Sequence, residues 1–285
     1  MYTTVLIATD GSEVATTAAN LGLAVAEKLG AEVHVLSVAA VRTGHDDVRR
    51  SDAQEYVDAI ARTATERGLS VHVQTAVRDG QPHQEILRYA TECNADLLVL
   101  GTHGRTGLRR WLLGSVATTV IRESRRPVLT SNALTTGPPR QFDTILVATD
   151  GRPGGEAAID HGIELADAYD ASVHAVSVVD ETISSLPAVL EEFERVGMQA
   201  TADVEARAAK AGVSTVRVVN RGIPHEAIIE YADERAVDLI VVGTEGRTGL
   251  GRLAFGSVSQ RIVGKAPVPV LTVRSADSSR AHHSG

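Results

Sequence analysis

The feature of this sequence that most restricts its fold is an internal duplication. Residues 80–116 and 222–258 align at a constant offset of 142, with 21 identities in 37 positions. Near the start of each copy, "TVLIATDGS" (4–12) matches "TILVATDGR" (144–152) at an offset of 140. Solenoid repeats have periods of about 20–50 residues, so two copies of this length predict two whole domains. We place them at 1–132 and 142–275, with a polar, Pro- and Gly-containing linker at 133–141 and a flexible tail at 276–285.

Each copy alternates short apolar runs with helical patterns. In the first copy the expected strands are "TTVLIAT", "EVHVLSVAAV", "SVHVQTAV", "DLLVL" and "PVLTS". The helices between them include one from the capping Ser12 to Gly30, one over about 48–67, one opening at Pro82 and one from Ser115. This order predicts an α/β fold with a doubly wound parallel five-stranded sheet in each domain. Ligands of such sheets bind beyond the carboxyl ends of the strands, where Asp10 and Gly101 follow the first and fourth strands.

Composition excludes several classes of protein. Hydrophobic residues make up 43% of the 285 residues, which is enough for a globular core. The net charge of −8 argues against binding to nucleic acid, and apolar runs of strand length argue against a membrane span. A single cysteine, Cys93, allows neither an internal disulfide nor a cysteine-based metal site. Because the N-terminus reads as a first strand and not as a signal peptide, we expect a cytoplasmic protein.

A long glycine-containing segment follows the fourth strand of each copy. "GTHGRTGLRRWLLGSV" (101–116) and "GTEGRTGLGRLAFGSV" (243–258) share the spacing Gly-x-x-Gly, nine residues, Gly-Ser. Glycines let a backbone approach a ligand, and the free amides at a helix start favour an anion, by about 0.3–1 kcal/mol at an exposed end. The alternative is that the serines are ordinary N-caps and the glycines only shape a turn. Identical spacing in both copies favours a phosphate site, formed by Gly101, Gly104, Gly114, Ser115 and Val116, and by Gly243, Gly246, Gly256, Ser257 and Val258.

These motifs resemble the universal stress protein family, in its ATP-binding subgroup. The resemblance rests on "ATDG" after the first strand, "HVLSV" and "HAVSV" in the second, "GxPHxxI", and "GRTGL" with the Gly-Ser that follows. It covers nearly the whole chain and implies a Rossmann-like, adenine nucleotide alpha hydrolase-like sheet of order 3-2-1-4-5 in each domain.

The same resemblance implies one nucleotide site per domain. Asp10 and Asp150 would lie beside the ribose or magnesium-bound phosphates, and the main chains of Val38 and Val178 would hold adenine. Gly101 and Gly243 would border the ribose. The phosphates would be bound by Gly104, Gly114, Ser115, Val116, Gly246, Gly256, Ser257 and Val258. The expected ligand is ATP with magnesium, with AMP or another adenine nucleotide as the alternative.

Two departures from the family pattern affect the first loop. Ala8 and Ala148 stand where many relatives have proline. The sequence "GRPGGE" after Asp150 predicts a looser start for the first helix of the second domain. If one of the two sites is weaker, we therefore expect it to be the second.

Repeated catalytic groups are not evident. His103 lies in the glycine-containing segment, but the second copy has Glu245 at that position. We interpret His83 and His225 as first-turn residues, and His34 and His174 as packing residues. No protein-only metal site is expected. The segment arginines, which either contact phosphates or are solvated, are Arg105, Arg109, Arg247 and Arg252.

The sequence thus supports three functional hypotheses. The first is an ATP-binding stress-response module with one nucleotide site per domain. The second is a slow ATPase or self-phosphorylating enzyme, and the third is a nucleotide-free interaction scaffold. By the resemblance, the final strands would pair the two domains into an internal pseudo-dimer, and dimerisation of the whole chain is a further possibility.

Overall fold

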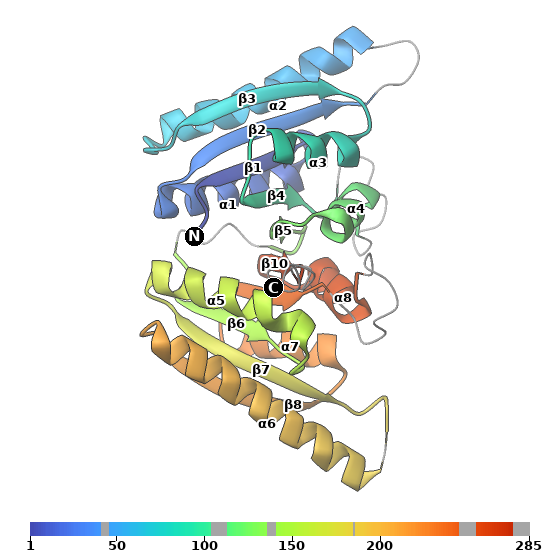
Figure 1. Cartoon of the computed structure of the whole chain (residues 1–285). Coiled ribbons are helices and arrows are strands. Elements are labelled where there is room, and N and C mark those ends of the chain that lie inside the picture. The colour runs from blue at the N-terminus through green and yellow to red at the C-terminus, as the bar shows by residue number, and fades with distance from the viewer. Residues whose placement is uncertain (41–45, 104–112, 136–140, 185, 245–254, 276–285) are drawn as a thin grey trace, which may run out of the picture.

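The computed structural model describes residues 1–40, 46–103, 113–135, 141–184, 186–244 and 255–275. They form one ten-stranded sheet with helices on both faces (Figure 1). The strands are β1 Thr4–Thr9, β2 Glu32–Ala39, β3 Val73–Asp79, β4 Leu97–Gly101, β5 Val128–Ser131, β6 Thr144–Ala148, β7 Ser172–Asp180, β8 Thr215–Gly222, β9 Leu239–Gly243 and β10 Val270–Val273. The helices are α1 Glu13–Leu29, α2 Asp46–Glu66, α3 Pro82–Glu92, α4 Ser115–Glu123, α5 Glu156–Tyr169, α6 Pro187–Lys210, α7 Pro224–Glu234 and α8 Ser257–Lys265, with a 3-10 turn, η1, at Pro153–Gly155.

The strand order is β3-β2-β1-β4-β5-β10-β9-β6-β7-β8. Each half therefore has the order 3-2-1-4-5, and all strand pairs within a half are parallel. The predicted doubly wound α/β fold is confirmed. We call β1–β5 with α1–α4 the first repeat, and β6–β10 with α5–α8 the second repeat.

The two repeats meet at β5 and β10, which pair antiparallel in the middle of the sheet (Figure 1). We call these strands the central strand pair. The Thr130 hydroxyl donates to the Val270 carbonyl at 3.1 Å, and the Thr272 hydroxyl donates to the Val128 carbonyl at 3.1 Å. Each strand would be an unpaired edge in an isolated repeat, so the pairing satisfies two rows of backbone groups at once.

Side chains of successive strand residues are buried on opposite faces of the sheet. In β1, Val5 and Ile7 join the core beneath α1 and α2, while Leu6 joins the core beneath α3 and α4. All three are fully buried, as expected for parallel strands with helices on both faces. Burial of each such side chain stabilises the fold by about 1.5–3 kcal/mol. The rigid sheet that results fixes the positions of the loops at its carboxyl edge.

Capping residues explain the difference between the first helices of the repeats. The Ser12 hydroxyl accepts the Ala15 amide at 3.2 Å, and Gly30 ends α1 in the left-handed conformation, at φ +66°. In the second repeat, η1 precedes α5, and the N-cap Gly155 provides no side-chain cap. The looser helix start predicted from "GRPGGE" is confirmed.

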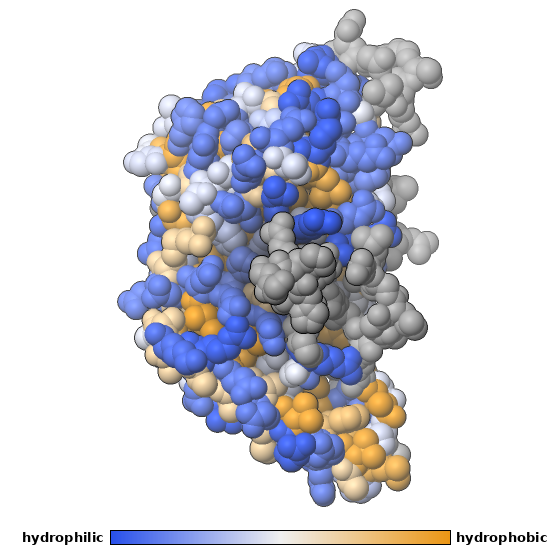
Figure 2. All heavy atoms as spheres, viewed as in Figure 1, coloured by the Kyte–Doolittle hydropathy of each residue, from blue (hydrophilic) through white to orange (hydrophobic). Residues whose placement is uncertain are grey.

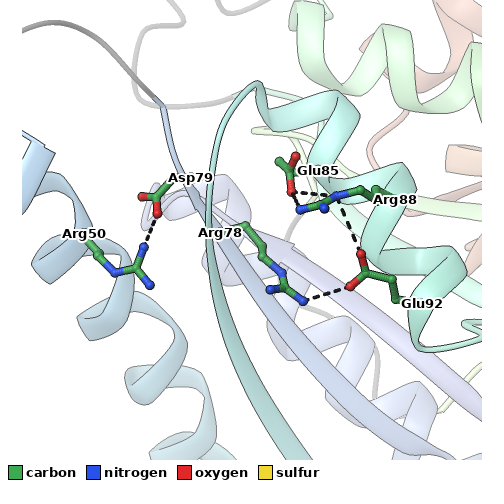
Figure 3. Close-up of polar contacts among 6 residues, drawn as sticks. All are labelled: Arg50, Arg78, Asp79, Glu85, Arg88 and Glu92. Carbon is green, nitrogen blue, oxygen red and sulfur yellow. Dashed lines mark hydrogen bonds and ion pairs between the residues drawn. The ribbon is translucent and has the colours of Figure 1, made fainter.

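Charged side chains cover the outer strand β3. Arg50 of α2 pairs with Asp79, and Arg78 of β3 donates to Glu92 of α3 at 2.9 Å (Figure 3). Arg88 pairs with Glu85 and also lies 3.7 Å from Glu92. Charges along an edge strand discourage pairing with another chain.

Among the described residues, the large hydrophobic side chains that are exposed lie almost entirely in the second repeat. Besides Met1, the exposed large hydrophobic residues among the described residues are Ile183, Leu186, Val196, Met198, Val216 and Ile223. Figure 2 shows hydrophobic residues gathered at the lower right, where Figure 1 places the β7–α6 connection and the start of α6. Among the described helices, none has the length and apolar character needed to cross a membrane.

Candidate functional site

The candidate site of the first repeat lies at the carboxyl edge of β1 and β4. These strands pair in register up to Ala8 and Leu100, so Asp10 and Gly101 lie at the same edge, as expected. A Cβ atom on Gly101 would lie 3.0 Å from the backbone nitrogen of Ala15, so this glycine lets the strand end pack against the first turn of α1. The requirement for glycine at this position is therefore structural as well as a possible ligand contact.

The carboxylates after the first strands shape the turns that contain them. Asp10 is half-buried, and its Oδ1 accepts the amide of Ser12 at 3.1 Å. In the second repeat, Asp150 is exposed, and its Oδ1 accepts the Arg152 amide at 3.1 Å. The other carboxylate oxygen of Asp150 lies 3.5 Å from Arg152 Nε. The two carboxylates hold the same place in the fold, and Asp150 lies near the guanidinium of Arg152 in its own turn.

Helix α4 begins with three amides that have no acceptor within the helix. Gly114 is its N-cap, and the Gly114 amide donates to the carbonyl of the buried Thr102 at 2.7 Å. The amides of Ser115, Val116 and Ala117 are the first three of the helix and have no intrahelical acceptor. Ser115 is exposed, so its hydroxyl and these amides form a donor group that an anion can reach.

The second repeat has the same construction. Gly256 caps α8 and donates its amide to the Thr244 carbonyl at 2.9 Å, and Ser257 is the exposed first residue of the helix. The alternative that Ser115 and Ser257 are N-caps is wrong. Each preceding glycine is held by a strand-end carbonyl just outside the helix, which moves the serine to the first helical position.

The valines that follow these serines point away from the free amides. Val116 and Val258 are partly buried and pack against the core that contains Val120 and Ile262, as the four-residue spacing predicts. In the second repeat, the side chain of Ser259 also donates to the carbonyl of Gly243 at 2.7 Å, which ties α8 to the end of β9.

The main chain of Val38 faces the β1 side of its strand. The Glu32 amide donates to Thr3, which precedes β1, at 2.9 Å, whereas the Ala39 carbonyl accepts from Gly80, beyond β3, at 3.1 Å. Since successive residues of a strand bond alternately to its two neighbours, even-numbered residues of β2 face β1. Val38 is one of them.

Val38 of β2 and Val178 of β7 both lie beyond the last residue of their strand that pairs with the neighbouring strand. The β1–β2 register ends at Thr9 and Ser37, and the β6–β7 register ends at Ala148 and Val176, two residues before Val178. Backbone groups in this position can bind a ligand edge without breaking a strand pairing.

Several expected residues cannot be placed. Gly104 and Gly246 lie outside the described residues, as do the four segment arginines Arg105, Arg109, Arg247 and Arg252. The expected site is therefore described through Asp10, Val38, Gly101, Gly114, Ser115 and Val116, and through Asp150, Val178, Gly243, Gly256, Ser257 and Val258.

The histidines in the strands are structural. His34 Nδ1 lies 3.0 Å from the Tyr89 hydroxyl, and His174 Nδ1 lies 2.9 Å from the Tyr231 hydroxyl. Burial lowers the pKa of both imidazoles below its ordinary value. The packing role predicted for this pair is confirmed. His225 is also buried, in the first turn of α7, and burial lowers its pKa too.

His103 is the histidine at the candidate site. Its Nδ1 lies 2.9 Å from the Thr102 hydroxyl, while its Nε2 is buried without a hydrogen-bond partner among the described residues. Burial lowers its pKa, which favours the neutral ring at pH 7. Thr102 and Thr244 were not singled out from the sequence, although their identity in the two copies was a visible signal.

Comparisons with known proteins identify the family. The model of the universal stress protein family matches residues 1–131 and 141–274. The chain belongs to the universal stress protein family. A universal stress protein of Methanocaldococcus jannaschii is 36% identical over 140 residues, which cover 47% of this chain and 82% of that relative. One of Mycobacterium tuberculosis is 33% identical over 196 residues, and this stretch is 64% of this chain and 63% of that relative's length.

A solved structure shares the fold over nearly the full length. The crystal structure of a universal stress protein from Archaeoglobus fulgidus has a TM-score of 0.69 and covers 96% of this chain and 97% of its own. The identity is 21%, so this likeness concerns the fold alone.

Proposed function

We propose that this universal stress protein binds one adenine nucleotide in each repeat and acts as a nucleotide-dependent regulatory module in a stress response. The observation that carries the proposal is the repeated helix start. In both repeats a Gly-Ser pair opens a helix, and the glycine amide is held by a threonine carbonyl at the end of a strand. The amides that remain free then have a fixed position, which favours recognition of a phosphate.

The other described residues fit the remaining parts of such a ligand. The Val38 and Val178 backbones lie past the end of the neighbouring strand pairing, where an adenine edge would replace the missing strand. Gly101 keeps the strand end close to α1. ATP would bring a magnesium-bound polyphosphate, and Asp10 and Asp150 are the carboxylates at that edge. Because α5 follows a 3-10 turn and lacks the side-chain cap that Ser12 gives α1, we expect weaker binding in the second repeat.

The test is a calorimetric titration of nucleotide-stripped protein with ATP, with and without magnesium. We expect two sites per chain. AMP is to be titrated as well, and so is cAMP, since one universal stress protein was solved in complex with it. A folded protein that binds none of these ligands would refute the proposal and favour a nucleotide-free interaction scaffold.

Matched variants assign each site. Ser115→Asp and Ser257→Asp place a carboxylate at an exposed first helical position, which suits the helix but repels a phosphate. At about 4 Å this repulsion amounts to about 1–4 kcal/mol, or at least about a fivefold loss of affinity. Ser115→Asn and Ser257→Asn are the neutral controls. Each aspartate variant should weaken binding at one site at least about fivefold, and unchanged affinity at both sites would contradict the assignment.

ATP hydrolysis and self-phosphorylation can be measured on the same nucleotide-stripped protein. In the described part of the chain, His103 is the only candidate site histidine, and it has no histidine counterpart in the second repeat. We therefore expect at most weak ATP hydrolysis and no self-phosphorylation. An initial rate that disappears in an Asp10→Ala, Asp150→Ala double variant would instead establish the enzymatic alternative.

We also propose that the central strand pair makes the chain an internal pseudo-dimer of domains 1–132 and 142–275. The cross-strand bonds of Thr130 and Thr272 support this. After limited cleavage within 133–141, the two fragments should stay together on a sizing column. Free separation would contradict the proposal, and the same column reports whether the intact chain dimerises further. A cytoplasmic location remains a prediction, to be checked by cell fractionation.

A further inference from the structure

The end of the first repeat contacts a helix of the second repeat. Asn132, the residue directly after β5, is buried. Its side-chain amide donates to the carbonyl of Val263 at 3.1 Å and to the carbonyl of Ala266 at 2.8 Å. These carbonyls lie at the C-terminal end of α8, where the last turn leaves acceptors without intrahelical donors. Asn132 therefore caps α8 from the other repeat.

The oxygen of the same side chain fixes the amide's orientation. Asn132 Oδ1 accepts the backbone amide of Leu134 at 2.7 Å, and the Asn132 backbone amide donates to the Thr135 hydroxyl at 3.1 Å. Both donor hydrogens of the Asn132 amide are thus directed at α8. An aspartate at this position would direct an oxygen at the same carbonyls.

Helix α8 is the helix whose other end forms the candidate phosphate site of the second repeat. It contains only nine residues, so its two ends are about 13 Å apart at about 1.5 Å per residue. Near its start, Ser259 bonds to Gly243, and Gly256 bonds to Thr244. A change in the position of the capped end therefore reaches the free amides at the other end through a short rigid element.

Asn132 is also linked to the candidate site of its own repeat. The Gly114 amide donates to Thr102, and the Thr102 amide donates to the Ser131 carbonyl at 2.8 Å. Ser131 directly precedes Asn132 in the chain. A hydrogen-bonded path thus runs from the start of α4, through Thr102 and the end of β5, to the end of α8.

The reciprocal contact is weaker. At an offset of 142, Arg274 occupies the position of Asn132 and follows β10. Its guanidinium Nη1 donates to the Arg122 carbonyl, in the last turn of α4, at 3.4 Å, and this bond is exposed. A long exposed bond constrains α4 less than two buried bonds constrain α8.

We propose that Asn132 of the first repeat is a positioning residue for the nucleotide site of the second repeat, and that it couples the two sites. The inference rests on the proposed function, because it concerns the same two sites. Because coupling between two binding sites is reciprocal, occupancy of either site should change the affinity of the other site by the same factor.

The test separates the sites with the aspartate variants. In the Ser115→Asp protein the first site is weakened, and adding Asn132→Ala should weaken ATP binding at the second site at least about threefold. In the Ser257→Asp protein the same change should leave first-site affinity within about twofold. Thr130→Val is the matched control, because it removes a bond across the central strand pair but leaves the two bonds from Asn132 to α8 in place.

Hydrogen exchange of α8, measured with and without ATP, distinguishes a positioning role of Asn132 from a general effect on the stability of the protein. In the Ser257→Asp protein, ATP at the first site should change hydrogen exchange of the α8 amides, and Asn132→Ala should abolish that change. If Asn132→Ala fails to fold, Asn132→Ser, which keeps one donor, takes its place. Unaltered second-site affinity and an α8 exchange pattern insensitive to first-site ATP would overturn the inference. If the Ser115→Asp and Ser257→Asp proteins bind no ATP even before Asn132 is changed, the proposed function itself is refuted.

Discussion

Replacing Gly11 by alanine tests whether the first-repeat loop is held by the ring of Tyr56. Gly11 and Gly151 occupy equivalent turns, and both have φ of +75°. A Cβ atom on Gly11 would lie 2.4 Å from Cδ1 and Cε1 of the Tyr56 ring. At Gly151 the nearest atom would be the Cβ of Ala200, at 3.2 Å. The two glycines thus share their backbone strain and differ in steric overlap.

The expected losses follow from these two terms. An alanine in the left-handed region costs about 1–2 kcal/mol relative to its favoured conformations, and this term applies at both positions. Overpacking against the Tyr56 ring adds about 1–3 kcal/mol at Gly11. We therefore expect Gly11→Ala to lower the free energy of unfolding by about 2–5 kcal/mol, and Gly151→Ala by about 1–2 kcal/mol.

Urea unfolding followed by far-ultraviolet circular dichroism measures both losses. The double variant Gly11→Ala, Tyr56→Ala should lose at least about 1 kcal/mol less than the sum of its single variants, because the overlap disappears with the ring. Equal losses at Gly11 and Gly151, together with additivity in the double variant, would refute the reasoning. That result would mean that the ring moves aside freely.

Three further predictions concern the sheet. Burial lowers the pKa of His34 and His174 below 6.5 in the folded protein. The unfolded chain therefore takes up protons first, and the free energy of unfolding decreases as the pH falls below about 6.5. The double variant His34→Gln, His174→Gln should make this decrease shallower between about pH 7 and 5, as measured by thermal melts. Thr130→Val and Thr272→Val should each lower the free energy of unfolding by about 0.5–1.5 kcal/mol, and an unchanged urea midpoint would contradict their bonding role. Asp96→Ala should lower the melting temperature, because the Asp96 carboxylate accepts three bonds from Thr3 and Thr4 at the start of β1, and a neutral result would be inconsistent with this.

The sequence predicted features that depend on local chemistry. Ser12 and Gly30 mark the ends of α1 because a hydroxyl cap and a left-handed glycine act within one helical turn. The strand expected at "SVHVQTAV" begins only at Val73, since β3 starts where pairing with Val33 of β2 begins. Pairing partners, and not β propensity, determine that boundary.

Features that depend on distant partners escaped the sequence analysis. Ser115 was weighed as an N-cap, but the contact of Gly114 with Thr102 moved the cap by one residue. Asn132 gave no signal, because its partners Val263 and Ala266 lie far away in the sequence and accept through their backbone. Every residue has a backbone carbonyl, so the sequence does not indicate which of them accept a bond from a distant side chain.

The central strand pair also has an evolutionary consequence. When two identical chains join along a strand, symmetry puts the same residue at both ends of the junction, and every substitution appears twice. Within one chain the junction forms at a fixed effective concentration, whatever the amount of protein, and each end can change by itself. Asparagine at 132 with arginine at the equivalent position 274 is a combination that no homodimer can encode. Within one chain, each half can therefore carry a contact that the other half lacks, as Asn132 does at the end of α8.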